Sequence, residues 1–283
     1  MSATLERPPA AAVAVPRPAP RHRRTFAALV GRGLLDQRRA PLTWGGGLGA
    51  MTALIMAIWP SVEGSVDELL ESYPQGLKDA FGIGELDSVE AYVDAEMFSL
   101  MIPLAVGFLA IRAVTRMLVG AEDRGHLDTL LSLPLSRRVL VAAAMTVAGL
   151  VVAAVLAVVW ALSALTGLVA GVGMDEAGLA AGVANVWPLA FAFAGVAAFA
   201  CGLRDRQATV TAIATGTLVA MYVFDLLGKL TDSAEPLRTV SAFRLYGSAI
   251  QDGLDPGHIA VLVLAGTALA WAGAVLFDRR DIH

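Results

Sequence analysis

Long apolar runs alternate with short polar connections along most of the chain. Six runs carry few charged residues and approach or exceed the roughly 20 residues that a helix needs to cross a bilayer. They cover residues 42–59, 96–120, 139–166, 177–203, 207–227 and 258–277. Because helices satisfy their own backbone hydrogen bonds in lipid, the pattern predicts an all-α integral membrane protein with six transmembrane helices.

Composition supports this class. Of the 283 residues, 57% are hydrophobic and 16% are charged, whereas soluble domains carry about 25% charged residues. The single cysteine, Cys201, cannot form a disulfide within one chain. The four histidines are scattered without the spacing of metal ligands, so the sequence offers no metal site.

The region before the first run divides into two parts. Residues 1–24 are rich in Pro, Ala and Arg, which predicts a disordered cytoplasmic tail, and residues 25–283 are expected to form the transmembrane domain. From residue 25 to residue 39, apolar side chains recur on one helical face: Phe26, Leu29, Val30, Leu34 and Leu35. This pattern predicts an interfacial amphipathic helix that lies along the inner membrane surface.

Basic residues indicate the orientation in the membrane. Seventeen of the 21 lie in the N-terminal region, the 112–138 connection, the 204–206 turn and the C-terminal tail, whereas the opposite connections hold four. Since cytoplasmic connections carry the excess of Lys and Arg, we expect both termini in the cytoplasm.

Two longer segments are expected on the outer side. Residues 61–96 hold ten acidic residues and one lysine, with apolar positions at the spacing of two short amphipathic helices on the outer rim. The second outer segment, residues 228–257, has mixed charge.

The connection at residues 121–138 is the most distinctive polar segment. Three charged residues and a glycine precede a leucine ridge, a helix-stopping proline, a capping serine and a basic residue. They are Glu122, Asp123, Arg124, Gly125, Leu127, Leu130, Leu131, Pro134, Ser136 and Arg137. A short helix lying crosswise at the membrane would tilt the spans at both of its ends when pushed; an ordinary cytoplasmic loop is the alternative interpretation.

These residues resemble the signature of ABC-2 type permeases, the membrane subunits of ATP-binding cassette transporters. In that family the pattern is roughly acidic-acidic-x-Gly-x-Leu-x-x-Leu-Leu-x-x-Pro-x-Ser-Arg between the second and third spans, and His126 stands where Thr is more usual. The resemblance extends from about residue 25 over nearly the whole chain. It includes the interfacial helix, the six spans and a stretch with Ser241, Phe243 and Tyr246 before the last span.

The resemblance implies a half-transporter of the ABC-2 type permease fold in a bacterial plasma (inner) membrane. It would pair with a second permease subunit, as a homo- or heterodimer, and a separate ATPase subunit would dock beneath residues 121–138. The chain lacks a GxxxxGK[ST] sequence, so ATP and Mg are expected on the partner ATPase and no cofactor on this chain. The implied function is export of amphipathic small molecules such as drugs or antibiotics. Lipids are the other expected partner, and nucleic acid is not expected.

A few residues within the spans are candidates for a translocation path. Arg112 and Arg116, one turn apart, could attract anionic or amphipathic cargo or could extend to the lipid headgroups. Pro103 could kink the second span, and Asp225 lies near the outer end of the fifth. Gly45 and Gly49 form a GxxxG pair, which fits either a dimer seam or packing within the subunit.

Other classes of protein fit less well. An ion-coupled secondary transporter is expected to keep ionisable groups at mid-membrane, whereas charges here lie near the span ends. A membrane-embedded enzyme needs convergent catalytic groups at one depth, and a non-transporting structural membrane protein is a further alternative. The chain is therefore not expected to be catalytic by itself.

Overall fold

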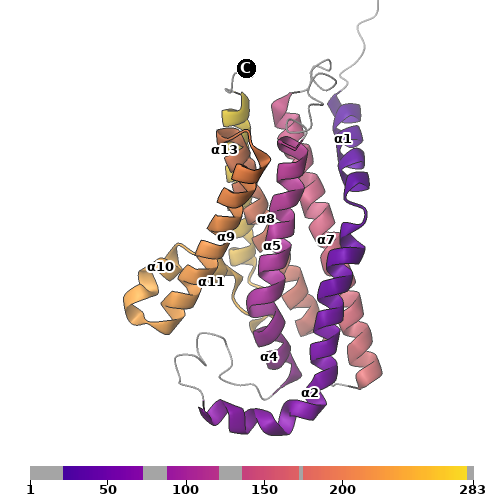
Figure 1. Cartoon of the computed structure of the whole chain (residues 1–283), viewed down its shortest axis with the longest axis vertical. Helices are drawn as coiled ribbons and strands as arrows, with labels where there is room; N and C mark the ends of the chain where they lie inside the picture. Colours follow the sequence, from indigo (N-terminus) through magenta and orange to yellow (C-terminus); the bar gives the residue numbers. More distant parts are fainter. Residues whose placement is uncertain (1–21, 73–87, 121–135, 172–174, 279–283) are drawn as a thin grey trace, which may run out of the picture.

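The computed structural model describes residues 22–72, 88–120, 136–171 and 175–278. Within these residues, six helical stretches are long and apolar enough to cross a membrane, which confirms the predicted fold class. They are Pro41–Ser61, Val89–Leu118, Arg137–Ala170, Glu176–Leu203, Gln207–Leu230 and Pro256–Asp278. The last four are the helices α7, α8, α9 and α13 (Figure 1).

The ends of the bundle differ in what they carry. The start of α1 (His22–Asp36), the C-terminal end of α13 and the two helix ends that flank residues 121–135 lie together at the top of Figure 1. We call this the inner end, because the basic connections lie there. The opposite end, which we call the outer end, carries α4 (Val89–Val93) and the connection between α9 and α13.

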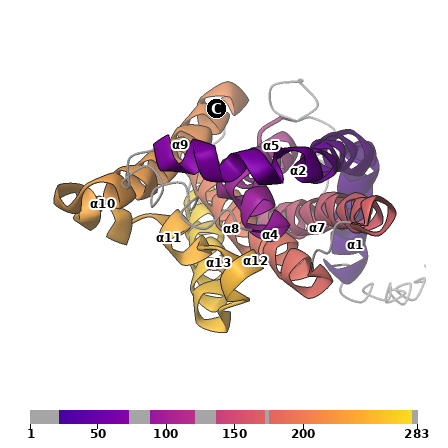
Figure 2. The ribbon, with the colours of Figure 1, turned by 90° about the horizontal axis from the view of Figure 1, so that it is seen from below.

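Helix α8 forms the centre of the bundle, and α5 (Ile102–Leu118), α7, α9 and α13 all pack against it (Figure 2). It is apolar on every face, as expected of a helix surrounded by other helices. Its contact with α13 is unusually close because glycines face each other. A Cβ atom added at Gly202 would lie 2.7 Å from the Gly273 carbonyl oxygen, and one at Gly195 would overlap the backbone of Gly266. The small residues therefore set the distance between these two helices.

The first span follows α1 (His22–Asp36) through a π-helical turn, η1 (Pro41–Gly45), and continues as α2 (Gly46–Ser72). The predicted N-terminal helix is present, and α1 runs alongside the inner part of α7 (Figure 1). Gly33 allows this contact, since a Cβ there would lie 2.8 Å from a methyl group of Val147. Leu35, assigned to the apolar face, is 66% exposed.

The GxxxG pair of the first span is used inside the subunit. A Cβ atom at Gly45 would lie 2.8 Å from the Val155 carbonyl oxygen, and one at Gly49 would lie 2.8 Å from Leu162. Both glycines therefore face α7, which favours packing within the subunit over a dimer seam.

The second span begins earlier than predicted. It consists of α4 (Val89–Val93), a π-helical stretch η2 (Asp94–Met101) and α5 (Ile102–Leu118). The predicted start near Glu96 is wrong because Val89, Ala91 and Val93 are buried in the bundle. Of the two rim helices expected in residues 61–96, the first corresponds to the end of α2, which turns across the outer end (Figure 1), and the second is the start of this span.

The outer connection between α9 and α13 contains four short helices. They are η3 (Asp232–Ala234), α10 (Glu235–Thr239), α11 (Ala242–Tyr246) and α12 (Ala249–Asp252). Helix α10 projects away from the bundle, whereas α11 and α12 turn back against it (Figures 1 and 2). Phe243, Tyr246 and Ile250 are buried as a result, so this connection is part of the core.

Candidate functional site

The candidate coupling segment joins two helices at the inner end. Helix α5 ends at Leu118 and α7 begins at Arg137, and both of these positions lie at the inner end of the bundle (Figure 1). Most of the candidate residues lie outside the described residues: Glu122, Asp123, Arg124, Gly125, Leu127, Leu130, Leu131 and Pro134. Ser136 and Arg137 are described, and so are the helix ends that hold the segment.

The start of α7 is attached to the end of α13. Arg137 donates a hydrogen bond to the carbonyl oxygen of Phe277, and its guanidinium carbon lies 5.2 Å from the centre of the Phe277 ring. The next residue, Arg138, pairs with Asp278 at 2.8 Å between Nε and Oδ2. Ser136 occupies the N-cap position, as predicted, but its hydroxyl makes no capping bond and its carbonyl accepts from Leu140.

The end of α5 is attached to the start of α9. The Thr115 and Thr211 hydroxyl oxygens lie 3.3 Å apart, and the Thr115 carbonyl accepts the N–H groups of Val119 and Gly120. A Cβ at Gly120 would lie 2.6 Å from the Arg116 carbonyl oxygen and 2.8 Å from Gln207 Oε1, so the backbone at the end of α5 favours glycine here. The two helix ends that flank residues 121–135 are thus each attached to a further span, α9 on one side and α13 on the other.

Two of the path candidates lie on one face of α5. Arg112 is exposed and Arg116 is half-buried. The Arg112 guanidinium carbon lies 5.9 Å from the centre of the Phe108 ring, and that ring lies 6.3 Å from the ring of Trp44 on η1. A cation above an aromatic pair is an arrangement that can bind the polar head and the apolar body of an amphipathic molecule.

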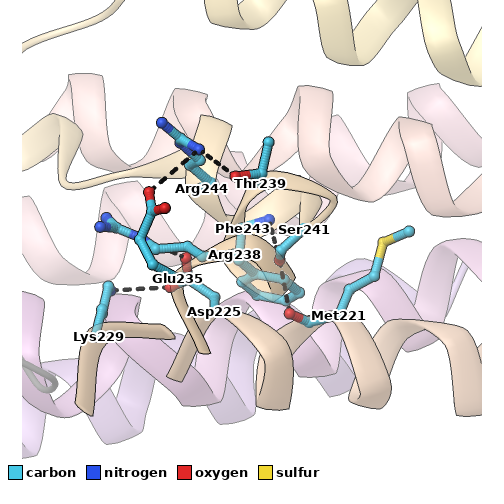
Figure 3. Close-up of polar contacts among 9 residues, drawn as sticks. All are labelled: Met221, Asp225, Lys229, Glu235, Arg238, Thr239, Ser241, Phe243 and Arg244. Carbon is cyan, nitrogen blue, oxygen red and sulfur yellow. Dashed lines mark hydrogen bonds and ion pairs between the residues drawn. The ribbon is translucent and has the colours of Figure 1, made fainter. Parts of the chain in front are cut away.

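Pro103 and Asp225 do not join this group. Pro103 is buried in the first turn of α5, and Asp225 lies on α9 among charged partners (Figure 3). Its carboxylate is 7% exposed and lies 3.0 Å from Lys229 Nζ and 3.2 Å from Arg238 Nε. Since buried charges need partners, this pairing accounts for Asp225 by connecting α9 to α10.

The stretch that contains Ser241, Phe243 and Tyr246 holds the outer connection against three spans. The Ser241 hydroxyl donates to the Met221 carbonyl on α9 at 2.6 Å and accepts from the Phe243 N–H at 3.1 Å (Figure 3). The Phe243 ring lies 6.1 Å from that of Phe193 on α8. In the sequence this stretch stands out only through a family resemblance, and the structure shows that its residues make distinct contacts.

Tyr246 makes the deepest of these contacts. Its hydroxyl donates to the Phe98 carbonyl at 3.1 Å, and its own carbonyl accepts from Asn185 Nδ2 at 2.6 Å. Burial, followed by the nearby Asp94 carboxylate, raises the pKa of Tyr246 well above its usual value. The hydroxyl therefore stays protonated and able to donate. The sequence signal that could have revealed this contact is Pro103, which removes a backbone donor inside the second span.

Comparison with known proteins identifies a family. Residues 29–278 match the family model described as "Multidrug efflux system permease Rv1217c, C-terminal domain". No curated protein matches the chain. The matched residues include all six membrane-crossing helices and the later part of α1.

Proposed function

From the chain's membership of this multidrug efflux permease family, which is of the ABC-2 type, we propose that it exports amphipathic small molecules, drugs or antibiotics among them, with energy from a separate ATPase subunit. The chain is the membrane component of the transporter. In the proposed complex it binds no nucleotide and is not catalytic by itself, and ATP and Mg bind to the partner ATPase.

The proposed complex contains two permease subunits, identical or different, and two ATPases docked beneath residues 121–138. Closure of the ATPases would push on these segments and move the spans between inward- and outward-accessible arrangements. The observation that supports this mechanism most directly is the attachment of both segment ends, through Thr115 and Thr211 on one side and Arg137 and Phe277 on the other. Because helices transmit displacement along their axes, a push at the inner end would reach the outer end.

The distribution of charges supports a proposal for the position of the protein in the cell. The excess of basic residues at the inner end supports a bacterial plasma membrane location with both termini in the cytoplasm. Residues 121–138 would then face the cytoplasm, where ATP is present and where the ATPases can reach them.

The proposed path for cargo runs along the exposed face of α5. Arg112 and Arg116 would attract the polar or anionic part of a cargo molecule, and Phe108 and Trp44 would contact its apolar part. In this proposal Pro103 shapes α5, and Asp225 acts by keeping α10 attached to α9.

The test is ATP-dependent uptake of an amphipathic fluorescent dye into inverted membrane vesicles that contain the chain and a candidate ATPase. Uptake that requires ATP and survives a protonophore supports the proposal. Uptake that a protonophore abolishes in the presence of ATP would establish an ion-coupled carrier instead.

Docking is tested separately by co-purification of the ATPase. Glu122→Ala combined with Leu127→Ala should reduce the amount of ATPase recovered at least fivefold, as expected for the loss of contacts worth about 1 kcal/mol or more. The matched control is Leu254→Ala, which removes an exposed leucine from the outer connection. Equal recovery with both proteins would exclude the docking role of residues 121–138.

A further inference from the structure

The second span contains a break in its backbone hydrogen bonds. In a π-helical turn each carbonyl accepts from the N–H five residues ahead instead of four. The Ile102 N–H follows this register and donates to the Met97 carbonyl. The next donor in the same register would be residue 103, which is proline and has no N–H. The Phe98 carbonyl therefore lacks the backbone donor that the π-helical register calls for.

The hydroxyl of Tyr246 occupies the place of that missing donor. It lies 3.1 Å from the Phe98 carbonyl oxygen, and both residues are buried, Phe98 at 1% and Tyr246 at 8% exposure. Because buried carbonyl groups without a donor are costly, this bond stabilises η2 at the point where Pro103 weakens it.

The outer connection holds η2 at two points. The Ser248 hydroxyl lies 2.5 Å from Asp94 Oδ2 at the first residue of η2, and Tyr246 binds Phe98 four residues further on. Tyr246 is itself fixed by the bond from Asn185 on α8 and by the contact of its ring with Phe243. The hydroxyl is therefore presented to η2 from a fixed position in the core.

The register of η2 sets the direction in which α5 presents its side chains. A π turn adds one residue, and one residue corresponds to a rotation of about 100° around a helix axis. If η2 relaxed to an α-helix, Phe108 and Arg112 would turn by that amount relative to α4. We propose that Tyr246 is a positioning residue for transport, whose hydroxyl replaces the amide that Pro103 lacks and so keeps α5 in the register that export requires. This inference rests on the proposed function.

The experiment compares three variants in the vesicle assay, with transported dye measured per ATP hydrolysed. Tyr246→Phe removes only the hydroxyl and should lower this ratio about tenfold, as expected for an unsatisfied buried carbonyl. Pro103→Ala restores an N–H in the second span, and its own ratio serves as the reference against which the double variant is compared. The double variant should recover most of the loss, because the backbone can again satisfy the Phe98 carbonyl.

Tyr222→Phe is the matched control, because it removes a hydroxyl from another tyrosine whose ring contacts Phe243. It should leave the ratio unchanged. If Tyr246→Phe does not accumulate in the membrane, recovery of folded protein in the double variant replaces the transport readout.

The outcomes separate this inference from the proposed function. A wild-type chain that transports nothing with its ATPase would contradict the proposed function. A transporting wild type with an equally active Tyr246→Phe variant would overturn the inference alone. A Tyr246→Phe defect that Pro103→Ala does not repair would also overturn it, since the hydroxyl would then act in some other way.

Discussion

Arg238 Nε lies 3.2 Å from Asp225 Oδ1, and this ion pair connects the projecting helix α10 to the outer end of α9. Asp225 is the buried member, whereas Arg238 and Lys229 are each exposed by about a third, at 37% and 33%. The carboxylate is therefore the member whose removal changes the core, while its two partners can still reach water.

Asp225→Asn should lower the free energy of unfolding by about 1–2 kcal/mol, a value reduced from that of a fully buried pair because the partners are partly solvated. The measurement is thermal unfolding in detergent. Glu235→Gln is the control, since the pair of Glu235 with Arg244 is exposed and 4.0 Å long. Its effect should stay below about 0.5 kcal/mol. Equal effects of the two variants would contradict the anchoring role of Asp225.

Gly195→Ala should destabilise the protein by roughly 1–3 kcal/mol, because the added methyl group overlaps the backbone of Gly266 and separates α8 from α13. Gly216→Ala is the matched control: it lies in α9, and a Cβ there would have no neighbouring atom within 4 Å. That variant should unfold at or slightly above the wild-type temperature. A Gly195→Ala protein as stable as the control would show that the α8–α13 contact adjusts easily.

Alkaline pH should weaken the fold through Tyr246. Burial raises the pKa of Tyr246 above its ordinary value of 10.0, so the folded state favours the neutral hydroxyl. The resulting stability is complete below pH 10 and is lost as the pH rises through the higher pKa of the folded state. The wild type should therefore lose more stability above pH 10 than Tyr246→Phe does. Unfolding temperatures measured from pH 8 to about pH 11 check this difference, and parallel curves would exclude Tyr246 as its source.

Arg137→Ala should reduce dye transport several-fold while ATP hydrolysis continues, because the segment loses its attachment to the backbone of α13 at Phe277. Arg138→Ala should change transport less than about twofold, since its pair with Asp278 is 63% exposed on the arginine side and surface pairs contribute at most about 1 kcal/mol. The check is the ratio of transport to hydrolysis in vesicles. Identical ratios for the two variants would contradict transmission through α13.

Arg112→Gln should weaken export of anionic amphipathic dyes about fivefold or more and leave cationic ones nearly unchanged, as expected for the loss of a charge that contacts cargo. Arg32→Gln, an exposed arginine on α1, provides the control for a general change in surface charge. Uptake of paired anionic and cationic dyes gives the measurement. Unchanged selectivity would indicate that Arg112 extends to lipid headgroups.

The number and order of the spans could be predicted because hydropathy over 20 residues reports directly on the transfer of a helix into lipid. The residues at which the spans begin and end were less predictable. Val89 and Val93 belong to a stretch rich in acidic residues, so their burial in the second span depends on contacts that a local pattern cannot reveal. The packing of α1 against α7 likewise depends on Gly33, because this glycine faces Val147, which is more than a hundred residues away in the chain.

The residues of the candidate site were likewise predictable only where a local sequence pattern marks them. Arg137 could be found because it belongs to a local motif at residues 121–138, although its contact with Phe277 could not. Asp225 was noticed as a charge in an apolar run, but its pairing with Arg238 depends on how the outer connection folds back. The π turn at Phe98 requires a register change, and Pro103 alone signals a kink as readily as a missing donor.

The bond between Tyr246 and Phe98 joins residues 148 positions apart in the chain, which sets an order of assembly. When the ribosome has completed the second span, the donor for its unpaired carbonyl has not yet been synthesised. Three more hydrophobic helices must enter the membrane before the outer connection can fold back. The second span thus acquires the hydrogen bond from Tyr246 only after the fifth span has entered the bilayer. Chains truncated before Tyr246 would leave the Phe98 carbonyl without this donor and exposed to membrane quality control.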